Sequence, residues 1–309
     1  MTRRRLQIFA TRYAAYGTPF LRHSALSKIG GCRGILAIGF ASPWLASDRA
    51  MQMSLSEIGT IIVLFQMSHY RTFKDFYCGC VLQDMKKYFP TALSYTRFVA
   101  CQSAALMMLA AYLLSRKGKH TGLYYIDSTT LRVCHNKRIY RNKVFKGIAK
   151  RSKSTMGWVY GFKLHIVINH QGELIRFCLT KGNVDDRAVV RKLMANLKGL
   201  GAGDKGYLGK DLADDLAKHD LKFVTKVRKN MKNKMLSAFE KFFLKQRGIV
   251  ETIIDQLKNL YHVEHSRHRS PINFLVNTLA ALIAYSWRPN KPGIKTNNIK
   301  NNLYAVIQN

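Results

Sequence analysis

Acidic residues are scarce in this sequence, and their distribution restricts the partners that it can bind. The 309-residue chain contains 17 Asp and Glu against 51 Lys and Arg, which gives a formal net charge of +34. No acid occurs before Asp48, between Asp127 and Glu173, or after Glu264. The positive charge therefore extends over the whole chain, and a polyanion such as nucleic acid is the expected partner.

Cysteine pairs and long apolar runs are also missing. The six cysteines include no CxxC pair and no regular spacing, which predicts reduced thiols in a cytosolic protein. The apolar stretches Gly34–Ala46 and Ala104–Leu114 are shorter than the roughly 20 residues that a membrane-spanning helix needs, so no membrane anchor is expected. The acid-free first segment has the composition of an organelle transit peptide or of a basic DNA-binding arm.

The periodicity of apolar residues divides the chain into a helical part and an α/β part. Helical spacing extends from Met53 to about Lys87, with Ser54 and Glu57 as a capping box, and again from Ser94 to Ser115. The expected elements that follow are a strand at Gly122–Ile126, a hairpin of Gly161–Asn169 and Glu173–Leu179, helices at Asp186–Leu197 and Asp211–Lys218, a strand at Leu221–Val227, and helices at Leu236–Tyr261 and Pro271–Trp287. Strands that alternate with helices predict an α/β domain.

Two aspartates follow segments that could hold them close to a metal ion or a phosphate. Asp127 comes directly after the strand Gly122–Ile126, where its carboxylate would project from the sheet edge into solvent. Asp204 follows the glycine-rich segment Gly199–Gly203, and glycine permits close approach of the backbone. A tight turn at Asp204 is the competing structural interpretation.

A third carboxylate is expected from the helix over Leu236–Tyr261. Glu251 and Asp255 share one face of this helix with Arg247 and Lys258, and spacing does not choose between the two acids. Salt-bridged pairs on a surface helix would show the same pattern. Carboxylates close to DNA phosphates would repel them unless divalent cations intervene, and two ions of Mg²⁺ fit an all-oxygen site.

Three basic segments supply candidate contacts to DNA phosphates. The loop Arg132–Lys153 carries nine cations, no acid, and the aromatic residues Tyr140 and Phe145. Lys226–Lys234 and His265–Arg269 are also basic, and a solvated surface is the competing interpretation of each segment. The candidates from these segments are Arg138, Lys146, Lys150, Lys226, Arg228, His265, Arg267, His268 and Arg269.

Short motifs extend from the first predicted strand towards the last predicted helix. They are YIDST at 125–129, CHNKR at 134–138, KGIAK at 146–150, YGFKLH at 160–165, GNVDDR at 182–187, GDKGY at 203–207, ET at 251–252, DQLKN at 255–259 and EHSRHRS at 264–270. This series resembles the bacterial insertion-sequence 982 transposase family, and the resemblance covers about Met53 to Trp287.

The resemblance implies a ribonuclease-H-like catalytic domain, a mixed sheet flanked by helices, with the catalytic and metal-binding triad Asp127, Asp204 and Glu251. Asp255 would then support these ligands without binding the metal. Lys258 matches a basic residue near the scissile DNA, and Lys163 and Lys205 lie in matched motifs as further DNA contacts. The implied cofactor is two Mg²⁺ ions, with Mn²⁺ as a substitute, and the implied reaction is hydrolysis at the element ends followed by strand transfer.

The same resemblance implies the domain order and the partners. Residues 51–118 would be a helical DNA-binding module, 119–287 the catalytic domain, and 288–309 a basic polar tail. Residues 1–50 depart from the acid-containing helical start of the family, either as a divergent, fused or frame-altered segment or because translation begins at Met51 or Met53. The expected partner is double-stranded DNA at the terminal inverted repeats and the target site, bound by a homodimer or higher assembly in the bacterial cytoplasm at the nucleoid.

Three other functions stay open on sequence alone. Tyr285 follows a basic cluster and could be the nucleophile of a metal-independent recombinase. The spacing of His262, His265 and His268 allows a zinc site, although no cysteine pair accompanies these histidines. The net charge by itself is also compatible with a nucleic-acid-binding protein that has no catalytic activity.

Overall fold

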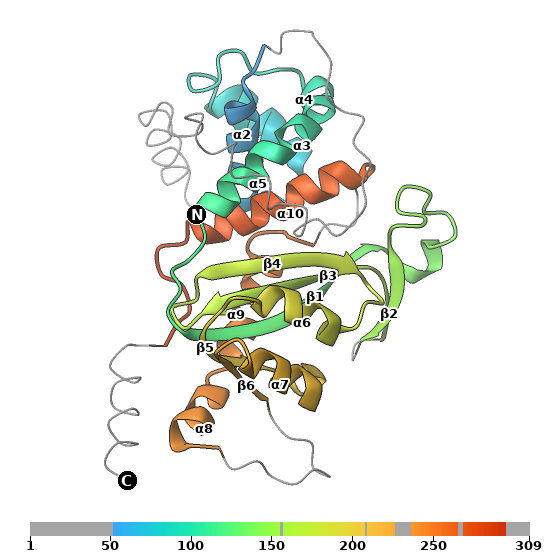
Figure 1. Cartoon of the computed structure of the whole chain (residues 1–309). Helices are drawn as coiled ribbons and strands as arrows, with labels where there is room; N and C mark the ends of the chain where they lie inside the picture. Colours follow the sequence, from blue (N-terminus) through green and yellow to red (C-terminus); the bar gives the residue numbers. More distant parts are fainter. Residues whose placement is uncertain (1–51, 155–156, 208, 226–235, 265–267, 295–309) are drawn as a thin grey trace. The chain divides into compact units, whose positions relative to one another are not determined.

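The computed structural model describes residues 52–154, 157–207, 209–225, 236–264 and 268–294. These residues form two compact units (Figure 1). The helical unit contains the described residues of 52–116 and 257–287, and the sheet unit contains those of 117–256 and 288–294. The atypical segment 1–50 lies outside the described residues.

The helical unit starts with α2 (Leu55–Met67), and its predicted capping box is confirmed. The Ser54 hydroxyl accepts from the Glu57 N–H at 3.2 Å, and the Ser54 N–H donates to Glu57 Oε2 at 2.8 Å. The helix expected up to Lys87 is interrupted after Met67, because the hydroxyl groups of Ser68 and Thr72 bond to neighbouring backbone groups. The remaining elements are α3 (Phe73–Asp75), a π-helical turn (Phe76–Asp84), α4 (Tyr95–Cys101), a 3₁₀ turn (Gln102–Ala105), α5 (Leu106–Ser115) and α10 (Pro271–Ser286).

Helix α10 packs against α2 and α5, so the division of the chain differs from the expected catalytic domain over 119–287. Every residue from Phe274 to Ser286 is buried, and a helix that is apolar on all sides needs neighbours all round. Gln66 Nε2 donates to Asn277 Oδ1 at 2.6 Å inside this packing. One described helical run, Tyr95–Ser115, has the length and composition to span a membrane; it is longer than the expected apolar stretch because α4 and α5 are continuous.

The sheet unit contains six strands with an antiparallel and a parallel half. β3 pairs antiparallel with β1 on one edge, and β2 and β4 follow each other along its other edge. β5 and β6 continue the sheet from β1 in parallel, which gives the order β4-β3-β1-β5-β6 and confirms the expected ribonuclease-H-like α/β fold. The strands are β1 (Leu123–Cys134), β2 (Lys150–Ser154), β3 (Gly157–Asn169), β4 (Leu174–Lys181), β5 (Gly199–Gly203) and β6 (Leu221–Thr225).

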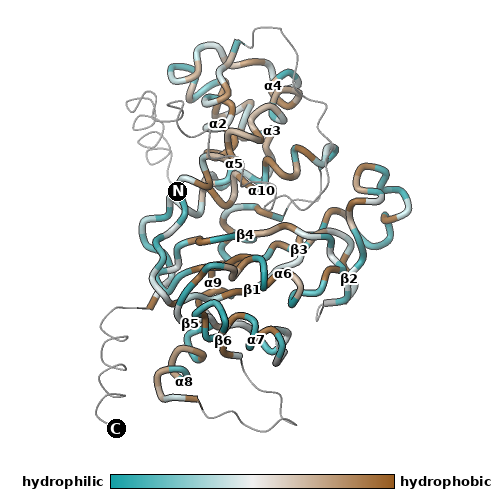
Figure 2. The backbone as a smooth tube through the Cα atoms, viewed as in Figure 1, coloured by the Kyte–Doolittle hydropathy of each residue, from teal (hydrophilic) through white to brown (hydrophobic). Residues whose placement is uncertain are grey.

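Helices cover both faces of this sheet (Figure 1). Tyr124 and Ile126 of β1 join the core formed with α6 (Asp186–Met194) and α7 (Lys210–Ala217). Tyr125 points to the opposite face, where its ring stacks on Phe243 of α8 (Ala238–Lys245) and its hydroxyl donates to the Phe243 carbonyl at 3.0 Å. Figure 2 shows apolar residues along the inner strands and mainly polar residues between β1 and β2.

Two local expectations about this unit were wrong, and one strand was not predicted. β1 continues to Cys134 and does not end at Ile126, because β3 pairs with it along its length. β5 is a strand although it is rich in glycine. The expected helix over Leu236–Tyr261 is two helices, α8 and α9 (Gly248–Asn259).

The described start of the polar tail, residues 288–294, belongs to the sheet unit. The Ile294 N–H donates to the His170 carbonyl at 2.8 Å, so the residues before 295 are bound to the turn between β3 and β4. That turn, predicted at His170–Gly172, is confirmed as the connection of the β3–β4 hairpin. The five cysteines in the described ranges are free thiols, as expected.

Candidate active site

Asp127 is the fifth residue of β1, and its side chain is mostly buried. The expectation that it projects from a strand end into solvent is therefore corrected. β3 covers one edge of β1 from Tyr124 to Cys134, whereas on the other edge the pairing with β5 stops at Tyr125. Asp127 thus lies just beyond the point where β1 loses one of its two neighbours.

Strand register places Asp204 beside Asp127. β1 and β5 are parallel, Tyr125 is level with Ala202, and each aspartate follows two residues later. Asp204 comes directly after β5, and its side chain is 50% exposed. The small residues of β5 permit this close packing, since a Cβ on Gly203 would lie 2.8 Å from Phe223 Cζ.

Glu251 approaches from α9, and Arg247 links it to Asp204. The chain turns at Arg247 between α8 and α9, and Gly248, a poor helix former, begins the second helix. The guanidinium of Arg247 lies 3.2 Å from Asp204 Oδ1 and also contacts Glu251 Oε1. Arg247 is only 13% exposed, so a largely buried cation holds two exposed carboxylates. Sequence reasoning noted its four-residue spacing from Glu251 but did not assign it to the site.

The three carboxyl groups of this site are balanced by only one cation, and burial and mutual repulsion disfavour their ionised forms. The pKa of Asp127 is raised to about 6, mainly by burial and in smaller part by the carboxylates of Asp204 and Glu251. The Ser128 N–H donates to Asp127 Oδ1 at 2.8 Å, and this bond and the charge of Arg247 lower the pKa only in part. Three carboxyl groups therefore share an electrostatic site with one guanidinium.

The donor set fits hard divalent cations. Mg²⁺ prefers oxygen ligands and is commonly held by one or two carboxylates, with water and substrate phosphates completing its coordination. Within the described ranges, no group of three or more His, Cys, Asp or Glu side chains is close enough to hold one ion. The residues Asp127, Asp204 and Glu251 could instead share two ions, which would compete with Arg247 for two of the carboxylates.

A second polar cluster, centred on Asp186, lies behind Asp127 and was not predicted. Asp186 Oδ1 accepts from Ser128 Oγ at 3.1 Å and from Lys163 Nζ at 3.2 Å, and lies 3.7 Å from His165 Nδ1. Strand pairing sets Ser128 opposite His165, on the face of β1 that Asp127 does not use. The cluster therefore ties the residue after Asp127 to β3 and α6.

Two members of this cluster differ from what their sequence context suggests. Lys163, expected to contact DNA, is 18% exposed and is paired with Asp186. Burial lowers the pKa of His165 to about 4, so its ring is neutral and its contact with Asp186 is not an ion pair. His165 Nε2 shares a hydrogen bond of 2.9 Å with Thr180 Oγ1. The GNVDDR motif contains Asp186, but only the fold shows what this residue contacts.

The other predicted DNA contacts are divided among several surfaces. Arg138, Lys146, Lys150 and Lys205 of the sheet unit are exposed, and so is Arg269 of the helical unit. Asp255, expected to support the metal ligands, is exposed on α9. The residues Lys226, Arg228, His265 and Arg267 lie outside the described ranges.

Two of the predicted contacts have partners within the helical unit. Lys258 Nζ lies 3.0 Å from Glu264 Oε2, and both side chains are about one third exposed or less. His268 packs edge-on against Phe274, with ring centroids 5.6 Å apart. Both side chains would have to rearrange before they could contact a phosphate.

Two of the competing interpretations, the tyrosine recombinase and the zinc site, receive no support from the described residues. Tyr285 is fully buried, which keeps its hydroxyl away from a phosphodiester bond. His262 stacks on Phe65 at a centroid distance of 5.9 Å. No metal-binding group of side chains that includes this histidine occurs among the described residues.

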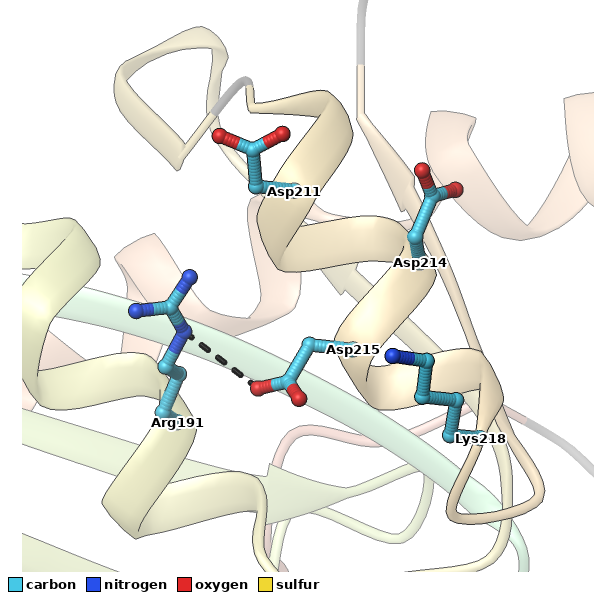
Figure 3. A pocket seen from close by; sticks show the side chains of 5 residues that line it. All are labelled: Arg191, Asp211, Asp214, Asp215 and Lys218. Atoms are coloured by element: carbon cyan, nitrogen blue, oxygen red, sulfur yellow. Dashed lines mark ion pairs between the residues drawn. The ribbon is translucent and has the colours of Figure 1, made fainter.

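An open pocket between α6 and α7 contains none of the three carboxylates (Figure 3). It has a volume of about 420 Å³ and is lined by Arg191, Asp211, Asp214, Asp215 and Lys218. Arg191 Nε faces Asp215 Oδ2 at 3.3 Å, whereas Asp211 and Asp214 point away from this pair. Asp214 is exposed, and it offers a matched control for substitutions of the three carboxylates.

Comparison with known proteins gives one family match and one structural likeness. The family model described as "Transposase DDE domain" matches residues 117–271, just over half of the chain, and this span contains Asp127, Asp204 and Glu251. The chain is similar to the piggyBac transposase in a synaptic complex with hairpin DNA, with 11% identity and a TM-score of 0.46 over 85% of this chain and 74% of that chain. A search of curated proteins gives no match.

Proposed function

We propose that this chain, which belongs to the transposase DDE domain family, excises and inserts a bacterial insertion sequence of the 982 family. Membership of the family makes it an enzyme of DNA transposition with a ribonuclease-H-like catalytic domain. The finer assignment to the 982 family rests on the motifs from YIDST at 125–129 to EHSRHRS at 264–270. The proposed reaction is metal-dependent hydrolysis at the element ends, followed by transfer of the 3′-hydroxyl to target DNA.

The convergence of Asp127, Asp204 and Glu251 on Arg247 is the observation that supports this proposal. These residues come from β1, from the end of β5 and from α9, and they are coupled electrostatically although they lie far apart in sequence. Acids are rare in the chain, and three of them in one place produce a local field that attracts cations within a basic protein. We assign the catalytic and metal-binding roles to these three carboxylates.

Each residue has a distinct part in the proposed mechanism. Asp127, Asp204 and Glu251 would hold Mg²⁺, which would supply activation of water or of the 3′-hydroxyl and stabilisation of the leaving oxygen. Asp127 is held on a strand and mostly buried, so it provides a fixed point for the site, whereas Asp204 and Glu251 are half exposed and can accept a ligand from solvent. Arg247 neutralises part of their charge until cations bind.

The partners follow from the same proposal. The substrate is double-stranded DNA at the terminal inverted repeats and at the target site, and Mn²⁺ substitutes for Mg²⁺. A homodimer or higher assembly would bring two element ends together in the cytoplasm at the nucleoid. The wide basic surface supports a contact with many phosphates.

Cleavage of the DNA that flanks the gene tests this function. The purified chain is incubated with a labelled duplex that carries one element end, with Mg²⁺ or with EDTA. Strand cleavage is expected with Mg²⁺ alone, and Asp127→Asn, Asp204→Asn and Glu251→Gln should each abolish it while DNA binding persists. Asp214→Asn is the matched control and should cleave normally. Cleavage in EDTA, or by any of the three site variants, would contradict the proposal.

A further inference from the structure

The described residues 132–154 and 157–161, which include the end of β1, the strand β2 and the start of β3, form an insertion that is held by a buried side chain. Phe145 is fully buried, packs edge-on against Phe162 at 5.9 Å, and its carbonyl accepts from the Tyr160 hydroxyl at 3.1 Å. Asn136 Nδ2 donates to the Trp158 carbonyl at 2.6 Å and so joins the start of the insertion to β3. Successive turn bonds connect His135 to Ala149. The surface of this insertion is therefore presented in a defined arrangement.

That surface is strongly basic and has no acid to balance it. Lys143, Lys146 and Lys150 are exposed, and none of them pairs with a carboxylate in the described part of the chain. The sequence from Ser128 to Gly172 contains no Asp or Glu at all. Charge alone would hold any polyanion here, and would not distinguish a duplex from a single strand.

Two exposed aromatic rings could distinguish between nucleic-acid forms, which charge alone does not. Tyr140 is 79% exposed and Trp158 is 50% exposed. The guanidinium of Arg141 lies 5.7 Å from the Tyr140 ring centroid, and that of Arg151 lies 5.0 Å from the Trp158 ring centroid. Large hydrophobic side chains are normally buried. Five are exposed in the described ranges, and three of these, Tyr140, Val144 and Trp158, lie in this insertion.

We propose that this insertion binds unpaired nucleotides by stacking their bases on Tyr140 and Trp158. In an intact duplex the bases stack on each other, so an exposed aromatic side chain has no free base on which to stack. An unpaired base offers a free π-face, and stacking on an aromatic side chain strengthens binding by about 5-fold to 100-fold per base. The paired arginines add cation–π attraction, and the surrounding lysines bind the phosphates.

This inference takes one point from the proposed function, namely that the partner is DNA. Strand cleavage at an element end produces ends whose bases can separate, and a protein that holds such bases would retain the cut end between the two chemical steps. Binding itself requires no metal and no catalysis. It can therefore be measured in EDTA, where the three carboxylates have no role.

Fluorescence of Trp158 gives a direct readout of stacking. The probe is oligothymidylate of about 12 nucleotides, compared with a duplex of equal length, in EDTA. The single strand is expected to quench the fluorescence of the full chain, and Trp158→Phe should remove most of that quenching, although Trp44 and Trp287 remain. Quenching that is unchanged in Trp158→Phe would overturn the proposal.

Affinity measurements separate stacking from charge. Trp158→Ala and Tyr140→Ala should each weaken single-strand binding about tenfold and duplex or heparin binding less than twofold. Trp158→Tyr, which keeps a ring, should restore most of the affinity, and Val144→Ala is the matched control in the same insertion. Equal loss for both DNA forms, no loss, or a changed oligomeric state in place of changed affinity would overturn the inference. Failure of Mg²⁺-dependent cleavage with intact stacking would affect only the proposed function.

Discussion

At the scale of single residues, Asp127 carries the largest energetic conflict of the site. Its carboxyl group is mostly buried beside two other carboxylates, and only the Ser128 N–H and Arg247 offset the cost of its charge. Such a group destabilises the metal-free fold when it ionises. Under the proposed metal-binding role, bound cations would offset this cost.

Asp127→Asn should stabilise the metal-free protein near neutral pH. The pKa is raised from 3.8 to about 6 on folding, so the folded protein holds the proton more tightly. The stability that this provides is complete below pH 3.8 and is lost as the pH rises through about 6. Asparagine has no charge to bury, so the substitution should increase the free energy of unfolding by about 2 to 3 kcal/mol at pH 7.

Urea unfolding in EDTA measures this effect. The gain of Asp127→Asn over the unsubstituted chain should be present at pH 7 and should vanish at about pH 4. Asp214→Asn, an exposed carboxylate outside the site, should show no comparable gain. A variant that is no more stable than the original chain at pH 7 would contradict the burial argument.

Arg247→Ala should make the fold more dependent on Mg²⁺. Removal of a guanidinium that contacts Asp204 and Glu251 leaves their charges opposed only by solvent, at a cost of about 1 to 3 kcal/mol without metal. The rise in Tm on addition of Mg²⁺ should then be larger than in the unsubstituted chain, because the competitor for both ligands is gone. Arg191→Ala, which breaks the exposed pair with Asp215, is the control. Equal Mg²⁺ shifts in both variants would show that Arg247 does not compete with cations.

At the scale of elements, β5 determines where Asp204 lies. Gly199 has φ of +114° and a Cβ there would lie 2.2 Å from the Gly122 carbonyl oxygen. A Cβ on Gly206, three residues beyond β5, would meet no atom within 4 Å. The two glycines therefore give opposite expectations within one short segment.

Gly199→Ala should cost at least about 2 kcal/mol, because the substitution combines an unfavourable φ with a backbone clash. Gly206→Ala should be neutral or slightly stabilising, since alanine restricts the unfolded chain and meets no obstacle. Denaturant unfolding of both variants checks this. Equal stabilities would mean that β5 and β1 are not packed as closely as the register indicates.

Local patterns predicted much of the fold, and long-range contacts account for what they missed. The capping box at Ser54, the hairpin at His170–Gly172 and the helix that begins at Asp186 depend on neighbours in sequence, and all were predicted. The predicted strand ended at Ile126, and only the pairing with β3 shows that Ser128–Thr130 belong to the same strand. Glycine disfavours strands in general, so β5 is recognised only from its pairing with β1 and β6.

For the candidate site too, local sequence predicted some residues and long-range contacts revealed the others. Asp127 and Asp204 were identified from their position after apolar or glycine-rich segments, but Glu251 and Asp255 could not be separated by spacing. The motifs selected Glu251, and the shared contact with Arg247 supports that choice. The Asp186 cluster joins residues up to 58 positions apart, which no local pattern reveals.

At the scale of the whole molecule, a net charge of +34 predicts DNA binding that weakens steeply with salt. Substitution of Lys143, Lys146 and Lys150 by alanine should reduce the slope of log K against log salt by roughly 2 to 3 for a duplex, about 0.9 per lost phosphate contact. Alanine at Lys192, Lys198 and Lys218, three other exposed lysines of the sheet unit, is the matched triple control. Fluorescence anisotropy across a salt series measures both slopes. Identical slopes would show that the insertion is not part of the surface that binds DNA.

Binding of catalytic cations by the three carboxylates is tested most directly by a change of ligand chemistry. Asp204→Cys replaces a hard oxygen with a soft sulfur at a side chain that is 50% exposed, so the fold should tolerate the change. Cleavage of a labelled element end should be lost with Mg²⁺ and recovered with the softer Mn²⁺, while Asp214→Cys should behave like the unsubstituted chain with both ions. Full activity of a folded Asp204→Cys protein with Mg²⁺, or no recovery with Mn²⁺, would contradict the account.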